Sequence, residues 1–505
     1  MAKRGRKGAH QMKRIVNALG KLNWGKRAYA VFVLCATTAI ALPAQTFTTL
    51  HSFNGTDGAG PYAGLVQATN GSLYGTTPGG GANGGGTVFR ITPSGTLTTL
   101  YSFCSQSGCT DGSGPFPGLV QATNGDLYGT TNGGGANCAP YGCGTVFKIT
   151  PSGTLATLYS FCYQSNCTDG ADPDGALVQA TNGNLYGTTT FGGASNVGTV
   201  FEITPGGTLT TLHSFDATDG AEPFAGLVQA TNGDFYGMTS TGGATCSPPY
   251  LFGCGTVFKI TPTGTLTTVY TFCSQGSNCA DGAVPEGTLV QATNGNLYGA
   301  TEIGGTASAT NGTVFTITPS GTLTTLHSFC YCTGGANPYA GLVQATDGNF
   351  YGTTETDGAH HGGTIFKITP KGKLTTLYNF CSQSGCTDGE NPYATLVQDT
   401  DGTFYGTTAS GGTNGYGTVF SLSVGLGPFV ETQTTSGKVG AAVKILGTDL
   451  TGATSVTFNG TAATFTVVSR YLITTTVPAG ASTGKVQVVI PIGTLSSNAP
   501  FRVVP

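Results

Sequence analysis

Apolar and polar residues alternate along this chain in short runs of the length that β-strands have. In the stretch 64–103, GLVQATNGSLYGTTPGGGANGGGTVFRITPSGTLTTLYSF, four such runs are separated by glycine-rich segments. The pattern returns six more times, and its LVQ triplets begin 50 to 62 residues apart, at Leu65, Leu119, Leu177, Leu227, Leu289, Leu342 and Leu396. Each copy therefore predicts a unit of four strands, and this spacing is typical of the blades of a β-propeller.

The predicted strands carry apolar residues on both of their faces. In GTVFKIT, Phe147 and Ile149 point to one side and Val146 to the other. A sheet with one face in water would alternate cleanly, so these sheets are expected to be covered on both sides. The Asn-Gly or Asp-Gly turn after LVQAT and the PSG turn after GTVFKIT each predict a tight hairpin.

The two ends of the repeat region complement each other. TFTTLHSF at 46–53 is an outer strand without its three partners, and GTVFSLSV at 417–424 lacks the PSGTLTTL segment that follows the other copies. We therefore expect the first strand to complete the seventh unit and close a ring. An open solenoid would instead need atypical capping units at its ends. The prediction is an all-β fold with a seven-bladed β-propeller over residues 45–424.

Composition agrees with short strands and tight turns, because the 505 residues include 83 glycines and 24 prolines and only 9% are charged. The first 44 residues combine nine basic side chains and no acidic one with an apolar run from 28 to 44, which predicts a signal peptide at 1–44. An uncleaved membrane anchor is the alternative, although the run is short for a span of about 20 residues. No other segment of the mature chain is expected to cross a membrane.

Charge excludes one class of partner. Without residues 1–44 the chain keeps 11 basic and 23 acidic side chains. Nothing in such a chain offsets repulsion by phosphates, so nucleic-acid binding is disfavoured.

The cysteines of the exported part fall into local pairs, and a repeat that lacks one cysteine of a loop lacks both. Because the two cysteines of a loop are present or absent together, and because the chain is expected to be exported, we predict disulfides that close the necks of these loops. A metal site is the alternative, but it needs a second cysteine pair from a neighbouring loop. The predicted pairs are Cys104/Cys109, Cys138/Cys143, Cys162/Cys167, Cys246/Cys254, Cys273/Cys279, Cys330/Cys332 and Cys381/Cys386.

A candidate binding site follows from the order of the connections. In an up-and-down unit the two tight turns share one end of the sheet and the two variable loops share the other, which predicts recognition at the loops. Just before each LV strand a proline precedes an aromatic or acidic residue, and these seven residues are expected to ring the mouth of a central channel: Tyr62, Phe116, Asp174, Phe224, Glu286, Tyr339 and Tyr393. Aromatic faces with a few carboxylates are suited to sugars. The alternative is that the aromatic rings are buried between units.

Catalytic and metal-binding readings are weaker. Asp174 and Glu286 lie two units apart, on the order of 10 Å, which is wide for a pair of glycosidase carboxylates. His51, His213 and His327 occupy a place that tyrosine fills in other repeats, which predicts packing. His360 and His361 share a variable loop, and a solvated loop is expected there. The repeated TDG supplies one aspartate per loop, too few for calcium, and is expected to form a turn. No catalytic residue, metal or cofactor is predicted.

Two resemblances complete this picture. The words NGxLYGTTxxGG, GTVFKITPSG and TLTTLYSF resemble the GloVer tandem repeat of exported bacterial proteins, over roughly 46–424, and imply propeller-like repeats without an established activity. From Gly427 the vocabulary changes, and GTDLTGATSVTFNGT within 427–505 resembles an IPT/TIG domain, which implies an immunoglobulin-like β-sandwich. Val443, Ile445, Val456, Phe458, Val486 and Val488 alternate as its inner face should.

Together these features predict a secreted or cell-surface protein that acts as a non-enzymatic binding or adhesion module, with an extracellular glycan or a surface protein as partner. The alternatives are an extracellular carbohydrate-active enzyme, a hydrolase or lyase, and a purely structural surface protein.

Overall fold

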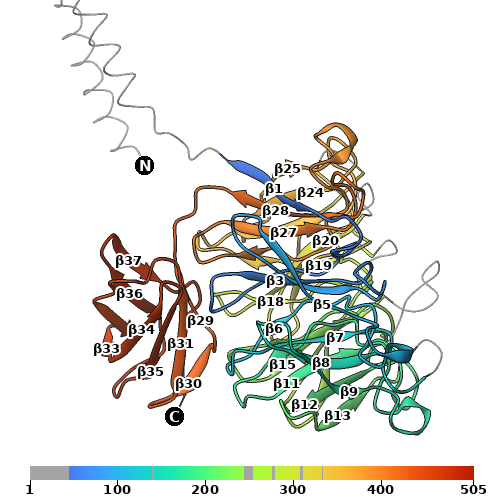
Figure 1. Ribbon diagram of the computed structural model, residues 1–505. Coiled ribbons are helices and arrows are strands. Elements are labelled where there is room, and N and C mark those ends of the chain that lie inside the picture. Colours follow the sequence, from blue (N-terminus) through green and yellow to red (C-terminus); the bar gives the residue numbers. More distant parts are fainter. Residues whose placement is uncertain are drawn as a thin grey trace, which may run out of the picture. The chain divides into compact units, whose positions relative to one another are not determined.

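The computed structural model describes residues 45–138, 142–243, 254–275, 279–306, 311–331 and 334–504. Within these ranges β-strands dominate (Figure 1), and the helical elements are single 3-10 turns, η1 (Ser107–Cys109), η2 (Ser165–Cys167) and η3 (Ser384–Cys386). None of the described helical segments has the length and apolar character that crossing a bilayer requires.

Residues 46–423 form seven antiparallel four-stranded sheets in the described part of the chain. Two of them are β2 (Val66–Gln67), β3 (Leu73–Thr77), β4 (Thr87–Ile91), β5 (Leu97–Ser102) and β6 (Val120–Gln121), β7 (Leu127–Thr131), β8 (Thr145–Ile149), β9 (Leu155–Ser160). The next two are β10 (Val178–Gln179), β11 (Leu185–Thr189), β12 (Thr199–Ile203), β13 (Leu209–Ser214) and β14 (Val228–Gln229), β15 (Phe235–Thr239), β16 (Thr256–Ile260), β17 (Leu266–Thr271). Two more are β18 (Val290–Gln291), β19 (Leu297–Thr301), β20 (Thr313–Ile317), β21 (Leu323–Ser328) and β22 (Val343–Gln344), β23 (Phe350–Thr354), β24 (Thr364–Ile368), β25 (Leu374–Asn379).

The remaining sheet joins strands from both ends of the repeat region. Strands β26 (Val397–Gln398), β27 (Phe404–Thr408) and β28 (Thr418–Ser423) follow one another, and β1 (Thr46–Ser52) is the fourth strand. β1 pairs antiparallel with β28, from Thr46 opposite Ser423 to Ser52 opposite Thr418. The pairing of the N-terminal strand is therefore the one that the phase of the repeats predicts.

Both faces of the sheets are covered, as the strand pattern predicts. All five residues of β3 are buried, and so are four of the five residues of β4. Gly75 in β3 is required by this packing, because a Cβ there would lie 2.6 Å from Cζ of Phe89 and 2.7 Å from Cδ2 of Leu65. The repeated LYGTT word thus keeps its glycine to admit a phenylalanine from the next strand.

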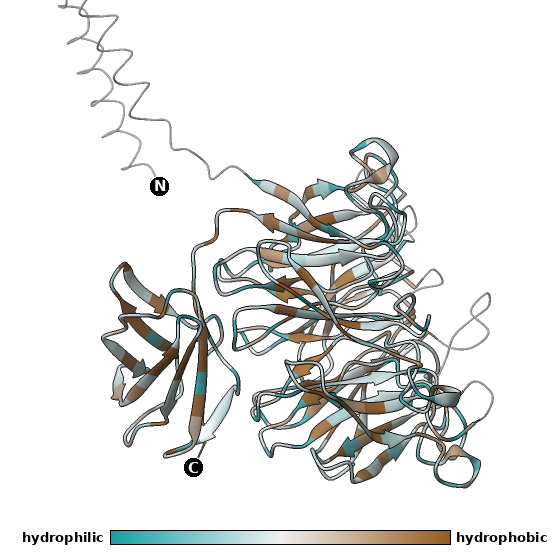
Figure 2. Cartoon of the chain, in the orientation of Figure 1, coloured by the Kyte–Doolittle hydropathy of each residue, from teal (hydrophilic) through white to brown (hydrophobic). Residues whose placement is uncertain are grey.

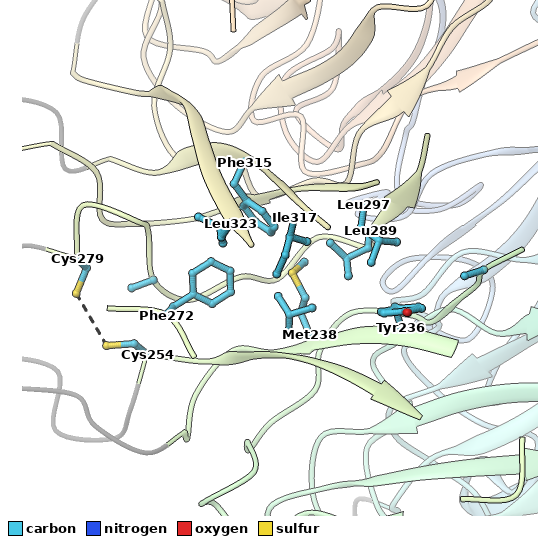
Figure 3. Packing of buried hydrophobic residues seen from close by; sticks show 13 residues of the cluster. Tyr236, Met238, Cys254, Phe272, Cys279, Leu289, Leu297, Phe315, Ile317 and Leu323 are labelled. Atoms are coloured by element: carbon cyan, nitrogen blue, oxygen red, sulfur yellow. Dashed lines mark hydrogen bonds between the residues drawn. The ribbon is translucent and has the colours of Figure 1, made fainter. Parts of the chain in front are cut away.

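Neighbouring sheets share their hydrophobic cores. Figure 3 shows one such core, in which Tyr236, Met238 and Phe272 from one sheet and its following loop face Leu297 and Phe315 from the next. Figure 2 shows the same distribution over the whole chain, with hydrophobic residues concentrated along the strands. The core that joins the first sheet to the last contains Leu73 and Phe89 together with Tyr405 and Val419. The ends of the repeat region therefore pack against each other in the same way as consecutive units.

The glutamine of each LVQAT word links its sheet to the preceding one. Gln121 Oε1 accepts a hydrogen bond from the Thr69 backbone N–H at 2.9 Å, and its Nε2 donates to the Gly125 carbonyl at 3.0 Å. The same bond to a neighbouring threonine N–H is made by Gln179, Gln229, Gln291, Gln344, Gln398 and Gln67. The bond of Gln67 reaches Thr400, so this chain of contacts also joins the first sheet to the last.

Residues 430–504 form a separate β-sandwich core. Its two four-stranded sheets have the orders β29-β31-β35-β34 and β33-β32-β36-β37, and β30 and β38 pair in parallel. Val443, Ile445, Val456, Phe458, Val486 and Val488, the six positions expected to face inward, are all buried in one cluster. The strands are β29 (Val430–Thr432), β30 (Ser436–Lys438), β31 (Ala442–Gly447), β32 (Ser455–Phe458), β33 (Thr461–Ala463), β34 (Phe465–Ser469), β35 (Leu472–Thr476), β36 (Val486–Ile490), β37 (Gly493–Ser496) and β38 (Arg502–Val504).

Candidate functional site

The proline before each LV strand is held by the preceding unit. A Cβ on Gly417, which precedes β28, would lie 2.8 Å from Cδ of Pro61, and a Cβ on Gly86, which precedes β4, would lie 2.7 Å from Cδ of Pro115. The other five prolines meet the corresponding glycine in the same way. Because proline fixes its own φ, this contact sets the direction of the residue that follows it.

The seven residues that follow these prolines all line one cavity of about 890 Å³. They are Tyr62, Phe116, Asp174, Phe224, Glu286, Tyr339 and Tyr393. None of the seven is fully buried, and Tyr62 and Phe116 are 39% and 38% exposed. The structure therefore brings together the whole set singled out in the sequence, and the rings are not sealed between units.

Four of the aromatic rings form a continuous arc along the cavity. The ring centroid of Tyr62 lies 5.5 Å from that of Phe116 and 4.9 Å from that of Tyr393. Tyr393 in turn meets Tyr339 edge to face at 5.2 Å. Ring faces in such an arc give a flat ligand a surface on which to pack.

Sequence reasoning missed three polar residues of the same cavity. Asn132, Glu302 and Glu355 also line it, and each directly follows the second strand of its sheet. The signal was present in the sequence, since the residue after the LYGTT word is Pro, Asn, Thr, Ser, Glu, Glu and Ala in successive units while the word itself hardly changes. A variable residue directly after an almost invariant motif indicates a position at which the fold does not require a particular side chain.

Hydrogen bonds orient the acidic side chains of the cavity. The Tyr393 hydroxyl donates to Glu355 Oε1 at 2.5 Å, and the Thr190 hydroxyl donates to Asp174 Oδ2 at 2.8 Å. Glu286 accepts a hydrogen bond from Tyr339. Its Oε2 atom is buried without a hydrogen-bond partner. The carboxylates are therefore held in place, and one of them has unused acceptor capacity.

Burial raises the pKa of these carboxyl groups. The pKa of Glu286 rises to about 7, chiefly because burial disfavours the charged form, and the negative charges of Glu302, Glu222 and Glu355 add to the effect. Burial likewise raises the pKa of Asp174 to about 6. The pKa of Glu302 is raised by burial and by the neighbouring Glu355. Ionisation of these carboxyl groups inside the cavity therefore costs free energy.

The TDG aspartates accept hydrogen bonds from within their own loops. Asp111 is fully buried, and its carboxylate accepts from the Tyr101 hydroxyl at 2.9 Å and from the backbone N–H groups of Ser105 and Gln106. Asp169, Asp281 and Asp388 accept in the same way from Tyr159, Tyr270 and Tyr378. The expected turn is present, and each aspartate also closes the neck of its loop.

The histidines in the tyrosine position have the same partner. His51 Nε2 lies 2.9 Å from Asp57 Oδ2, and His213 Nε2 lies 2.7 Å from Asp219 Oδ2. Packing is thus only part of their role, which corrects the sequence expectation. His327 lies in the unit that has lost the TDG sequence, and burial lowers its pKa.

One of the two loop histidines contacts a carboxylate. His361 Nδ1 lies 3.0 Å from Asp357 Oδ1. The His361 side chain is 85% exposed, in agreement with a solvated loop.

Five of the seven predicted cysteine pairs are joined as disulfides, namely Cys104–Cys109, Cys138–Cys143, Cys162–Cys167, Cys273–Cys279 and Cys381–Cys386. Cys254 is also placed against Cys273, which can form only one disulfide. Its predicted partner Cys246, like Cys332, lies outside the described residues.

Two of these disulfides lie side by side. The sulfur atoms of Cys138, Cys143, Cys162 and Cys167 all lie within 4.8 Å of one another. A second cysteine pair from a neighbouring loop is therefore present, as the metal alternative requires. The four sulfur atoms form two disulfide bonds, Cys138–Cys143 and Cys162–Cys167. A disulfide sulfur is not the thiolate that zinc binds.

Comparison with known families gives one match. The sequence profile of the Gloeobacter/Verrucomicrobia repeat fits the chain in three overlapping copies, over residues 36–248, 106–310 and 251–467. No curated protein sequence matches the chain.

Solved structures with a similar fold are propeller-like. A fungal alcohol oxidase of the AA5 family, in complex with copper, has a TM-score of 0.50 and 14% identity, with 91% of this chain and 99% of that chain covered. The extracellular domain of a hybrid two-component system from B. thetaiotaomicron has a TM-score of 0.47 and 12% identity, with 92% and 59% covered. A gluconolactonase from Xanthomonas campestris has a TM-score of 0.37 and 13% identity, with 76% and 92% covered. At these identities the likeness concerns the fold alone.

Proposed function

The chain belongs to the Gloeobacter/Verrucomicrobia repeat family, and we propose that it is an exported binding module that recognises carbohydrate in the cavity of its repeat region. The observation that carries this proposal is that seven repeat-equivalent residues converge on one cavity, five of them aromatic and two acidic. Sugar rings pack their C–H faces on aromatic side chains, and sugar hydroxyls donate to carboxylates.

In this proposal the repeat region is a seven-bladed β-propeller closed by its N-terminal strand. The pairing of β1 with β28 and the core shared by the first and last sheets support closure. The C-terminal sandwich is an immunoglobulin-like IPT/TIG domain that acts as a spacer or second binding module. Its buried alternating positions support that assignment.

Export and a location outside the cell are part of the same proposal. The basic and then apolar segment 1–44, which lies outside the described residues, has the pattern of a signal peptide. The disulfides of the loops support an oxidising compartment.

A carbohydrate-active enzyme is the second candidate, and the raised pKa of Glu286 favours it. A carboxyl group with a pKa of about 7 in a cavity can act as a general acid near neutral pH. Copper chemistry of the kind named for the alcohol oxidase does not fit, because no histidine or cysteine is found among the described residues that line the cavity.

The test is binding of the mature protein, residues 45–505, to an array of glycans and polysaccharides. The variant Tyr62→Ala/Phe116→Ala removes the two most exposed rings of the arc, and we expect it to lose at least tenfold in affinity, since stacking on each ring contributes roughly 1 kcal/mol.

The matched control is Tyr163→Ser. Tyr163 is 78% exposed on an outer loop, and Ser105, Ser274 and Ser382 occupy its place in other units. Loss of binding in both variants, or binding by neither the parent nor the control, would contradict the proposal. Release of shorter sugars from a bound glycan, abolished in Glu286→Gln, would establish the enzyme instead.

A further inference from the structure

We propose that the cavity selects saccharides that carry a free amino group, and therefore a positive charge. This inference rests on the proposed function and names the class of sugar. Four carboxyl side chains line the cavity, those of Asp174, Glu286, Glu302 and Glu355. The described residues that line it include no lysine, arginine or histidine. Its neutral polar side chains, among them Asn132, Thr288 and Thr395, can serve the hydroxyl groups of any sugar, whereas its charged side chains are all negative and favour a cation.

Among the described residues that line the cavity, no positively charged side chain pairs with these carboxyl groups. Glu286 meets the negative charges of Glu302, Glu222 and Glu355, and its buried Oε2 atom has no donor. Glu355 is hydrogen-bonded by the Tyr393 hydroxyl, which is a neutral donor. A protonated amine brings three N–H donors and a positive charge, and so supplies what this group of side chains lacks.

The aromatic arc is suited to the same ligand. Tyr339 and Tyr393 are hydrogen-bonded to Glu286 and Glu355. The ring centroid of Tyr393 lies 5.2 Å from that of Tyr339 and 4.9 Å from that of Tyr62. The face of an aromatic ring attracts a cation, and its apolar surface packs against the sugar ring that bears it. One lining therefore holds both the charged and the apolar part of an amino sugar.

A bare divalent cation fits the cavity less well. Among the described residues, the groups that bring three or more potential metal-binding atoms within 4.8 Å consist of cysteines, with Glu390 in one of them. The carboxylates of the cavity are not among these groups.

The test compares three oligosaccharides of equal length by isothermal titration calorimetry: glucosamine, N-acetylglucosamine and glucose oligomers. The second differs from the first by acetylation of the amine, which removes the charge. We expect the glucosamine oligomer to bind at least tenfold more tightly than the other two, and this advantage to shrink at high ionic strength.

Charge removal in the protein is the second arm of the test. Glu302→Gln/Glu355→Gln keeps the shape of both side chains and is expected to abolish the preference for the amine. The control Asp126→Asn removes a charge at a tight turn, where Asn184, Asn296 and Asn349 stand in other units, and the preference is expected to survive.

Proton release supplies a readout that does not depend on folding of a variant. Glu286 is partly protonated near neutral pH, in the field of Glu302, Glu222 and Glu355 and beside the Tyr339 hydroxyl. A bound cation favours its charged form, so binding should release protons and strengthen as the pH rises from 5 to about 7. Equal affinity for the three oligomers overturns the amino-sugar inference and leaves carbohydrate binding intact, whereas binding of none overturns both.

Discussion

Single buried carboxylates organise the variable loops of the repeat region. Asp111 gathers a tyrosine hydroxyl and two backbone N–H groups while it is fully buried. Histidine replaces this tyrosine in the two loops that lack cysteines and keep the aspartate, and it still meets the aspartate. The loop fold therefore depends on a donor in that position, and the aromatic character of the side chain is secondary.

Tyr101→Phe tests this dependence, because it deletes one hydroxyl and leaves the edge-to-face contact of the ring with Phe103. We expect the free energy of unfolding to fall by about 1–2 kcal/mol, the cost of leaving a buried carboxylate short of a donor. The measurement is urea denaturation followed by circular dichroism. His327→Phe is the matched control, since its unit has no TDG aspartate, and an equal loss in both variants would refute the argument.

The aspartate and its turn could be read from the sequence, but the partner could not. TDG predicts a turn by itself, because aspartate hydrogen-bonds nearby backbone and glycine adopts positive φ. Tyr101 lies ten residues before Asp111, and only the return of the chain at the loop neck brings them together. The substitution of tyrosine by histidine in the loops without cysteines was visible, yet it has no meaning until that geometry is known.

At the scale of the element, the two-residue inner strand is short but links neighbouring sheets. The side chain of Gln121 reaches one neighbour's backbone and its own turn at once. The strand pattern predicts the place of the LVQAT strand in each unit. It also explains the leucine of this strand, as a residue that faces the hydrophobic core. A glutamine in every copy was not explained by the alternation of faces, because its partner belongs to another sheet.

Gln121→Leu removes both hydrogen bonds and keeps a side chain of similar size. Gln121 is 9% exposed, so water replaces the lost partners poorly, and we expect a loss of about 1–2 kcal/mol of unfolding free energy. The control Gln487→Leu changes an exposed glutamine of strand β36 and should leave stability within about 0.5 kcal/mol. The measurement is thermal unfolding of both variants and of the parent protein. Equal stability of the Gln121→Leu variant and the parent protein would contradict the prediction.

For the whole molecule, the sheet that contains both β1 and β28 is the feature on which closure depends. β1 pairs with β28 over most of its length, and Phe47 stacks on Tyr378 of the adjacent sheet with centroids 3.8 Å apart. The sequence predicts this pairing because a single strand precedes the first unit and the last unit lacks its fourth strand. The convergence of seven residues on one cavity could be predicted from the same regularity. Glu302 and Glu355 stand at a position that varies between units, but the sequence does not show that this position faces the cavity.

Removing β1 should therefore weaken every unit and not only the last. We expect a chain that begins at Phe53 to unfold at a lower temperature and less cooperatively than one that begins at Gln45, as measured by calorimetry. Addition of the peptide TFTTLHS, the sequence of β1, should raise the transition temperature again, because the peptide can pair with the open edge of β28. A truncated chain with unchanged unfolding would show that the ring does not need this strand.

The shared sheet also imposes an order of events on assembly. Synthesis proceeds from the N-terminus, so β1 is made first, while β28 appears only after the strands of the other six sheets. Until then the backbone groups of β1 have no partner strand, and the same unpaired strand is exposed on every other newly made chain nearby. In a crowded solution β1 of one chain can pair with β28 of another chain, which yields strand-exchanged dimers with native contacts. The protein concentration during folding then sets the fraction of chains that exchange this strand.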